Sequence, residues 1–203
     1  ARDRVLRSGD WGTSGLGAIH RITGGTAGLV GYGAIARGLH ARLAGFGLAR
    51  VLVFDPYLSE PQARSASVVP CSLEDLLAES DYISIHAPLT DETRGLIGDE
   101  QFELMKPTAI LVNTARGAIV NERALIDALS DHRIAAAGLD TYEVEPLPAD
   151  SPLRSLDNVV LTDHCGYYSE ESLVDLKRKA ARNIALILQG REPLYPVNEA
   201  VRR

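Results

Sequence analysis

Cysteine is scarce in this 203-residue sequence, which has only Cys71 and Cys165, far apart and in no metal-ligand spacing. Neither a disulfide framework nor a zinc site is predicted, and no metal is expected. The chain also has no apolar run near the roughly 18 residues that a membrane span needs. Its first residues, ARDRVLRSGDW, lack a signal-peptide core. A cytoplasmic location is therefore the default expectation.

An excess of positive charge is missing as well. The chain has 21 Lys and Arg against 27 Asp and Glu, which gives a net charge of −6. This balance argues against general electrostatic binding to nucleic acid or to an anionic membrane. Hydrophobic residues make up 45% of the sequence, enough for a substantial core in one large domain.

The chain does contain a regular alternation of short β-rich runs and helical patterns. Several of the runs are apolar without alternation, as in strands that are covered on both faces. This order predicts an α/β fold with a doubly wound parallel sheet and right-handed crossovers. The predicted strands are 26–31, 50–55, 67–69, 81–87, 109–114, 135–140 and 158–164.

Four helices are predicted from apolar spacing and capping residues. The first runs from Ile35 until Gly45 and Gly47 stop it. The others begin at Ser72, where Asp75 forms a variant of the capping box, at Asn121, and at Ser169. Their predicted apolar faces are Ile35, Leu39, Leu43 and Phe46 in the first helix, Ala124, Leu125, Ala128 and Leu129 in the third, and Leu173, Leu176, Ala180, Ile184 and Ile187 in the last.

Gly31, Gly33 and Ala36 form a G-x-G-x-x-A motif directly after the first predicted strand. The first glycine permits a sharp turn, and the second lets the backbone approach a pyrophosphate. Such glycines also close ordinary βα turns. Asp55 lies about 20 residues further on, where a carboxylate can bind the ribose hydroxyls of NAD, although it could also cap the turn at Asp-Pro-Tyr. Together the two features favour NAD binding.

Three later strand ends carry Arg116, Glu145 and His164. An Arg can bind a substrate carboxylate, and an imidazole can exchange the hydroxyl proton during 2-hydroxy acid oxidation. A neighbouring carboxylate can hold the tautomer and stabilise the imidazolium. Singly, each has a structural explanation: an ion pair for Arg116, a structural role for His164, or a turn before proline for Glu145.

The segments GYGAIA…FDPY, HAPLTDETRGLI, MKPTAILVNTARGAIVNERALIDAL, AGLDTYEVEPLP and NVVLTDH resemble the D-isomer-specific 2-hydroxyacid dehydrogenase family. The resemblance implies an NAD-dependent oxidoreductase with a Rossmann-type domain. In it Arg116 binds substrate, His164 is the acid/base, and Glu145, rather than Glu143, is its partner. The implied cofactor contacts are Gly31, Gly33, Ala34, Ile35, Asp55, His86, Ala87, Pro88, Thr93, Thr114, Ala115, Arg116, Asp140, His164 and Gly166.

The sequence departs from this family at two places. Ala34 stands where the family usually has an Arg, which removes one possible phosphate contact. Asp163 and Cys165 flank His164, where the family has a proline and a small residue. A Cys165–His164 nucleophile is disfavoured, because successive side chains of an extended segment point to opposite faces. HCGYYSEESL also resembles the C-terminal binding proteins, NAD-binding transcriptional corepressors, so an NAD-sensing interaction protein is the alternative hypothesis.

The resemblance also has consequences for domain organisation. Residues 1–189 are expected to form the NAD-binding domain, with a leading linker helix at about 1–12. Residues 190–203 are expected to return to an N-terminal substrate domain that this chain lacks. Without that domain we expect nucleotide binding but little or no turnover. Family precedent also implies a homodimer through the NAD-binding domains, involving residues 11–20 and 142–152.

Overall fold

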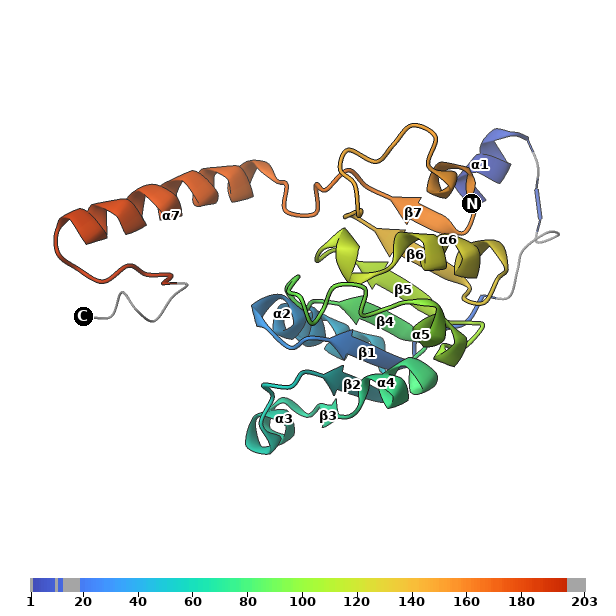
Figure 1. Ribbon diagram of the computed structural model, residues 1–203, viewed down its shortest axis with the longest axis horizontal. Helices are drawn as coiled ribbons and strands as arrows, with labels where there is room; N and C mark the ends of the chain where they lie inside the picture. The colour runs from blue at the N-terminus through green and yellow to red at the C-terminus, as the bar shows by residue number, and fades with distance from the viewer. Residues whose placement is uncertain (1, 10, 13–18, 197–203) are drawn as a thin grey trace. The chain divides into compact units, whose positions relative to one another are not determined.

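The computed structural model describes residues 2–9, 11–12 and 19–196. The chain divides into two compact units, residues 1–164 and 165–203, and each is described by itself. The first unit contains the sheet and the helices that cover it (Figure 1). It begins with α1 (Arg2–Arg7), which accounts for part of the linker helix expected at about 1–12.

The sheet has seven strands in the order β3-β2-β1-β4-β5-β6-β7, and every neighbouring pair is parallel. This order runs outward from β1 in both directions, which confirms the predicted doubly wound architecture. The strands are β1 (Thr26–Val30), β2 (Arg50–Phe54), β3 (Val69–Pro70), β4 (Tyr82–Ile85), β5 (Ile110–Asn113), β6 (Ala136–Leu139) and β7 (Val159–Leu161).

Two groups of helices cover the two faces of the sheet (Figure 1). One hydrophobic cluster joins the sheet to α4 (Leu73–Glu79), α5 (Asp99–Leu104) and α6 (Glu122–Ser130). A second cluster joins it to α2 (Ala34–Leu43) and α3 (Glu60–Ala66). Neither α3 nor α5 is among the predicted helices; both are short, with six or seven residues. Single turns of 3₁₀ helix lie at η1 (Ala44–Phe46), η2 (Gly117–Ile119) and η3 (Pro152–Ser155).

The strands alternate between these two clusters. In β1, Ala27 and Leu29 belong to the cluster with α2 and α3, whereas Val30 belongs to the other. In β2, Val53 belongs to the cluster with α2 and α3, and Leu52 belongs to the other. Strands that bury both faces need apolar side chains at successive positions, so the unbroken apolar runs in the sequence are explained.

The predicted helix starts at Asn121 and Ser72 are confirmed by the hydrogen bonds that cap them. The Asn121 side chain accepts from the amide of Ala124, and the four predicted residues of that helix are buried. Ser72 accepts from the amide of Asp75 at 3.0 Å, but the Asp75 carboxylate accepts from the Ser72 hydroxyl rather than from its backbone. The shorter side chain of Asp, compared with Glu, accounts for this difference.

Two details of the predicted elements are wrong. Ile35 and Phe46 are 73% and 47% exposed, whereas Ala36 is fully buried. Ile35 lies in the first turn of α2, and Phe46 belongs to η1, whose tighter winding moves it off the face of the α-helix. The predicted strand at 67–69 begins later, because Ser67 ends α3 in a left-handed conformation.

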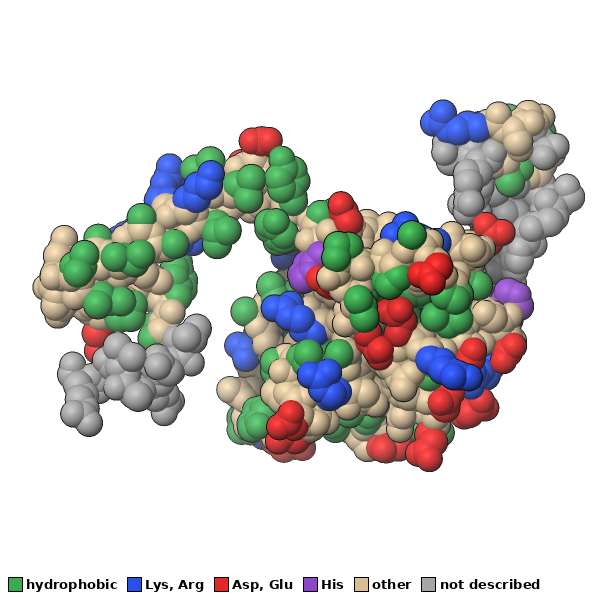
Figure 2. Space-filling view, turned by 45° about the horizontal axis from the view of Figure 1, so that its top comes forward, with side chains coloured by type: hydrophobic (Ala, Val, Ile, Leu, Met, Phe, Trp, Pro, Cys, Tyr) green, Lys and Arg blue, Asp and Glu red, His purple; other side chains and the backbone are tan. Residues whose placement is uncertain are grey.

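The second unit is dominated by α7 (Glu170–Leu188), which Ser169 caps as predicted. Its predicted apolar residues Leu176, Ile184 and Ile187 are exposed, and Figure 2 shows hydrophobic side chains along this helix. The segment after it bonds back to α7, since the amide of Leu194 donates to the Asn183 side chain at 2.9 Å. Among the described residues, no helix has the length and apolar character to cross a membrane.

Candidate functional site

The predicted site residues of the first unit lie at the carboxyl edge of the sheet, because all its strands are parallel. Most are on loops, and Ala34 and Ile35 are in the first turn of α2. Together these site residues follow all six strands other than β3. Gly31, Gly33, Ala34 and Ile35 follow β1, Asp55 follows β2, His86, Ala87, Pro88 and Thr93 follow β4, Thr114, Ala115 and Arg116 follow β5, Asp140 and Glu145 follow β6, and His164 follows β7. Gly166 lies in the second unit, so it is not placed against the others.

The glycine turn between β1 and α2 leaves room for a phosphate group. Gly31 has a φ of 92°, and a Cβ there would be 2.8 Å from the amide nitrogen of Ala87. Gly33 is the N-cap of α2, and a Cβ there would have no atom within 4 Å. With no side chain capping this helix start and no acidic residue in its first turn, the amides of Ala34 and Ile35 suit the diphosphate of NAD.

Asp55 is held by two backbone amides. Its Oδ2 accepts from Tyr32 at 2.7 Å, and its Oδ1 accepts from Tyr57 at 2.8 Å. Asp55 therefore does cap the turn. This role does not prevent it from binding NAD, because each carboxylate oxygen can accept another hydrogen bond, such as one from a ribose hydroxyl.

The loop after β4 packs closely against the glycine turn. The amide of His86 donates to the Val30 carbonyl at 2.7 Å. Burial lowers the pKa of His86, so its ring is neutral, and its Nε2 is buried with no partner among the described residues. Thr93 uses its hydroxyl within the loop, donating to Pro88 at 2.6 Å and accepting from Thr90. Thr93 therefore shapes the loop on which Pro88 lies.

Arg116 depends on Asn113, the last residue of β5. The Asn113 side chain is buried, accepts from the amide of Ala115 at 3.0 Å and donates to the Arg116 carbonyl at 2.9 Å. The Arg116 side chain itself is exposed, and its Nη1 donates to the Ala115 carbonyl. The buried amide thus fixes the backbone on which the guanidinium stands.

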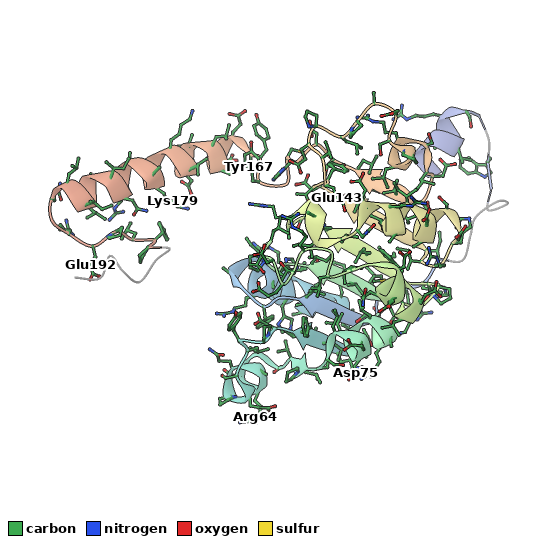
Figure 3. The ribbon with its side chains drawn as sticks, in the orientation of Figure 1. Arg64, Asp75, Glu143, Tyr167, Lys179 and Glu192 are labelled. Carbon is green, nitrogen blue, oxygen red and sulfur yellow. The ribbon has the colours of Figure 1, made fainter. Side chains whose placement is uncertain are left out.

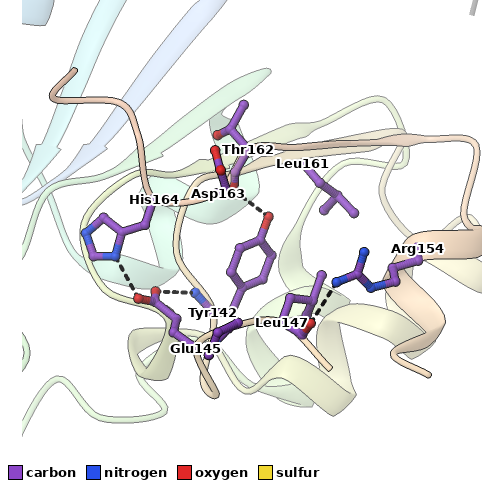
Figure 4. Close-up of a pocket in the computed structure, with 9 residues that line it drawn as sticks. Tyr142, Glu145, Leu147, Arg154, Leu161, Thr162, Asp163 and His164 are labelled. Atoms are coloured by element: carbon purple, nitrogen blue, oxygen red, sulfur yellow. Dashed lines mark hydrogen bonds and ion pairs between the residues drawn. The ribbon is translucent and has the colours of Figure 1, made fainter. Parts of the chain in front are cut away.

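Glu145 and His164 are hydrogen-bonded to each other. The Nδ1 of His164 lies 2.7 Å from Oε2 of Glu145, and Oε1 accepts from the amide of Tyr142 at 3.1 Å (Figure 4). The bond with His164 is the largest influence that lowers the pKa of Glu145, followed by the Tyr142 amide and then the charges of His164 and Arg116. Glu145 is therefore ionised at neutral pH, with the charge of Arg116 close enough to act on it.

A cavity of about 770 Å³ opens beside this pair. Arg154 closes one part of its wall. Its Nη2 donates to the Leu147 carbonyl (Figure 4). Its Nε donates to the Pro148 carbonyl. The lining residues are Tyr142, Glu145, Pro146, Leu147, Arg154, Leu161, Thr162, Asp163 and His164. The cavity therefore lies between the loop after β6 and the end of β7.

Glu143, two residues before Glu145, is engaged elsewhere. Its Oε1 accepts from the amide of Glu122, and its own amide donates to the Glu122 carboxylate, at 3.0 and 3.2 Å. Figure 3 labels Glu143 on the loop after β6. These bonds join that loop to the start of α6, which makes Glu143 part of the support of the site.

The sequence did not identify three residues that organise the site: Asn113, Gly117 and Tyr142. Asn113 could have been identified, because it is a polar residue at the end of an otherwise apolar strand. Gly117 and Tyr142 could not be identified in this way, because their close contact joins loops about 25 residues apart in the chain, and local sequence patterns do not predict such contacts.

Comparisons with known proteins show the family to which the chain belongs. The family model of the D-isomer specific 2-hydroxyacid dehydrogenase, NAD binding domain, matches residues 1–166. A glyoxylate reductase from Korarchaeum cryptofilum is 42% identical over 202 residues, which cover 98% of this chain and 60% of that protein. A D-3-phosphoglycerate dehydrogenase from Mycobacterium tuberculosis is 42% identical over 190 residues, 94% of this chain and 35% of that protein.

Solved structures give the same result. The D-lactate dehydrogenase with NAD⁺ from Lactobacillus jensenii matches with a TM-score of 0.85 and 31% identity, covering 97% of this chain and 62% of that chain. The chain thus spans less than two thirds of the length of these relatives. Since the matched domain is an NAD-binding domain, NAD is confirmed as the predicted cofactor.

Proposed function

Because the chain belongs to the D-isomer-specific 2-hydroxyacid dehydrogenase family, we propose that the full-length protein interconverts a small D-2-hydroxy acid and its 2-keto acid. The observation that carries this proposal is the 2.7 Å hydrogen bond between His164 and the ionised Glu145, at the edge of the sheet where we propose that the nucleotide binds. Arg116, whose guanidinium can bind a substrate carboxylate, is near enough for its charge to lower the pKa of Glu145.

Each of these residues has one task in the proposed reaction. Arg116 binds the substrate carboxylate, since a guanidinium can hold both oxygens at once. Glu145 accepts from Nδ1 of His164, which leaves Nε2 to face the substrate. In reduction His164 donates a proton from Nε2 to the carbonyl oxygen, and in oxidation it removes the hydroxyl proton.

When bound, NADH would supply the hydride for reduction, and NAD⁺ would accept it in oxidation. The residues proposed to hold its diphosphate are the open turn at Gly31 and Gly33 and the first amides of α2. Asp55 is proposed to bind the adenosine ribose, and the loops at His86–Pro88 and Thr114–Arg116 to lie along the rest of the cofactor. The remaining proposed contacts are Thr93, Asp140, His164 and Gly166.

The proposal extends to domains and assembly. Residues 1–189 act as the NAD-binding domain, and residues 190–203 return to a substrate domain in the full-length protein. Two copies pair through their NAD-binding domains; Trp11, which is 88% exposed, supports an interface there. Part of the proposed interface, residues 13–18, lies outside the described residues.

Steady-state oxidation of NADH by the full-length protein, with glyoxylate, hydroxypyruvate and pyruvate as substrates, tests the activity. We expect turnover of at least one acid and its loss in His164→Ala. Intact NADH binding without turnover of any keto acid would contradict the enzyme and favour an NAD-sensing interaction protein. Turnover by residues 1–203 alone at the rate of the full-length protein would contradict the proposed need for a substrate domain.

A further inference from the structure

We propose that Tyr142 is a positioning residue that holds together the three loops of the proposed catalytic residues; the inference therefore rests on the proposed function. Tyr142 follows β6 and is buried, 8% exposed. It contacts the loop of Glu145, the end of β7 and the loop of Arg116, each through a different part of the residue.

The first contact fixes Glu145. The backbone amide of Tyr142 donates to Oε1 at 3.1 Å, while Oε2 is bonded to His164. With each oxygen given a separate donor, the carboxylate cannot rotate without losing a charge-assisted hydrogen bond. Its orientation toward the imidazole is thereby set.

The second contact fixes the end of β7. The phenol of Tyr142 lies 2.7 Å from the carbonyl oxygen of Thr162 and 3.3 Å from that of Leu139, so the Thr162 carbonyl is its main acceptor (Figure 4). Burial is the main cause that raises the pKa of Tyr142, so the hydroxyl stays protonated and able to donate.

Thr162 is two residues before His164, whose φ of 56° lies in the left-handed region. This conformation is uncommon outside glycine and needs support from its surroundings. The hydrogen bond from the Tyr142 hydroxyl to the Thr162 carbonyl supplies such support just before His164 in the chain. The Thr162 hydroxyl adds to it by donating to Asp140 at 2.6 Å.

The third contact reaches the loop of Arg116. A Cβ at Gly117 would lie 1.9 Å from the carbonyl carbon of Tyr142, so the two backbones touch directly. Arg116 immediately precedes this glycine. Tyr142 therefore meets all three loops from one buried position, and a displacement there alters the distances between their functional groups.

The substitution Tyr142→Phe tests the proposal, since it keeps the ring and the backbone contacts and removes only the hydroxyl. In the full-length protein we expect kcat to fall about tenfold, the rate equivalent of one hydrogen bond, with an unchanged NADH dissociation constant. We also expect the ¹⁵N shift of His164 Nδ1, from long-range ¹H–¹⁵N correlation, to move away from its wild-type value.

The matched control is Tyr82→Phe, which removes a half-buried phenol at the start of β4, at the opposite edge of the sheet. It should leave kcat and the His164 shift unchanged. A Tyr142→Phe protein with wild-type kcat and wild-type His164 shift would overturn the inference, as would equal losses in both variants. If the wild-type protein turns over no keto acid, the proposed function fails, and the ¹⁵N measurement still decides whether Tyr142 positions His164.

Discussion

Gly117 and Tyr142 approach so closely that a Cβ on Gly117 would lie 1.9 Å from the carbonyl carbon of Tyr142. No rotation of a flexible side chain can relieve this contact, because the obstacle is backbone. The two loops that carry Arg116 and Glu145 therefore have a fixed separation, which a glycine at this position makes possible.

Replacing Gly117 with alanine should force these loops apart. We expect kcat/KM for the keto acid to fall by a factor on the order of 100, corresponding to about 2.7 kcal/mol of lost transition-state stabilisation. NADH binding, measured by fluorescence quenching, should change much less, because the turn proposed to hold the diphosphate follows β1, whereas Gly117 follows β5. A Gly117→Ala enzyme with wild-type kcat/KM would show that the separation of the loops does not matter.

Gly33 tests the proposed diphosphate site independently. Its φ of −74° is allowed for any residue and the space around a Cβ is open, so Gly33→Val should fold normally. The added side chain occupies the space proposed for the diphosphate, and we expect the NADH dissociation constant to rise at least about tenfold. Gly45→Ala, another position with no atom within 4 Å of a Cβ, is the control; similar affinities in both variants would exclude this site.

Asn113→Asp should separate substrate binding from cofactor binding. Aspartate keeps an acceptor for the Ala115 amide but loses the donor to the Arg116 carbonyl. Leaving the Arg116 carbonyl without its donor should cost about 1–3 kcal/mol and displace Arg116. We therefore expect KM for the keto acid to rise roughly tenfold. Asn158, which directly precedes β7, donates a comparable bond to the Leu129 carbonyl in α6, and Asn158→Asp should leave KM unchanged.

The pairing of Glu145 predicts a pH dependence of stability. Its pKa is lowered in the folded protein, so the pairing stabilises the fold above the ordinary Glu pKa and is lost as pH falls through the folded value. Since both side chains are more than a third exposed, the contribution should not exceed about 1 kcal/mol. Urea unfolding at pH 7 and pH 4 should show Glu145→Gln less stable than wild type at pH 7, with the gap narrowing at pH 4. A constant gap would mean that the carboxylate charge is not involved.

Much of this domain could be predicted from short-range patterns. Apolar runs gave the strands, and Asn121, Ser72 and Ser169 marked helix starts, because capping bonds join residues only three apart. Gly31, Gly33 and Asp55 were recognised because a βα turn and the next strand end have a nearly fixed spacing. Helical periodicity could not identify α3 and α5, because helices of seven and six residues are too short to show a repeating apolar pattern.

Which chemical groups stand at the ends of the parallel strands follows from the order of the strands and from the residue types, and both can be read from the chain. How those groups meet depends on the folded domain. The bond from His164 to Glu145 joins residues 19 apart in the chain, and Asn113, Gly117 and Tyr142 act through contacts between separate loops. Such contacts depend on the packing of the whole sheet, and local propensities contain no information about them.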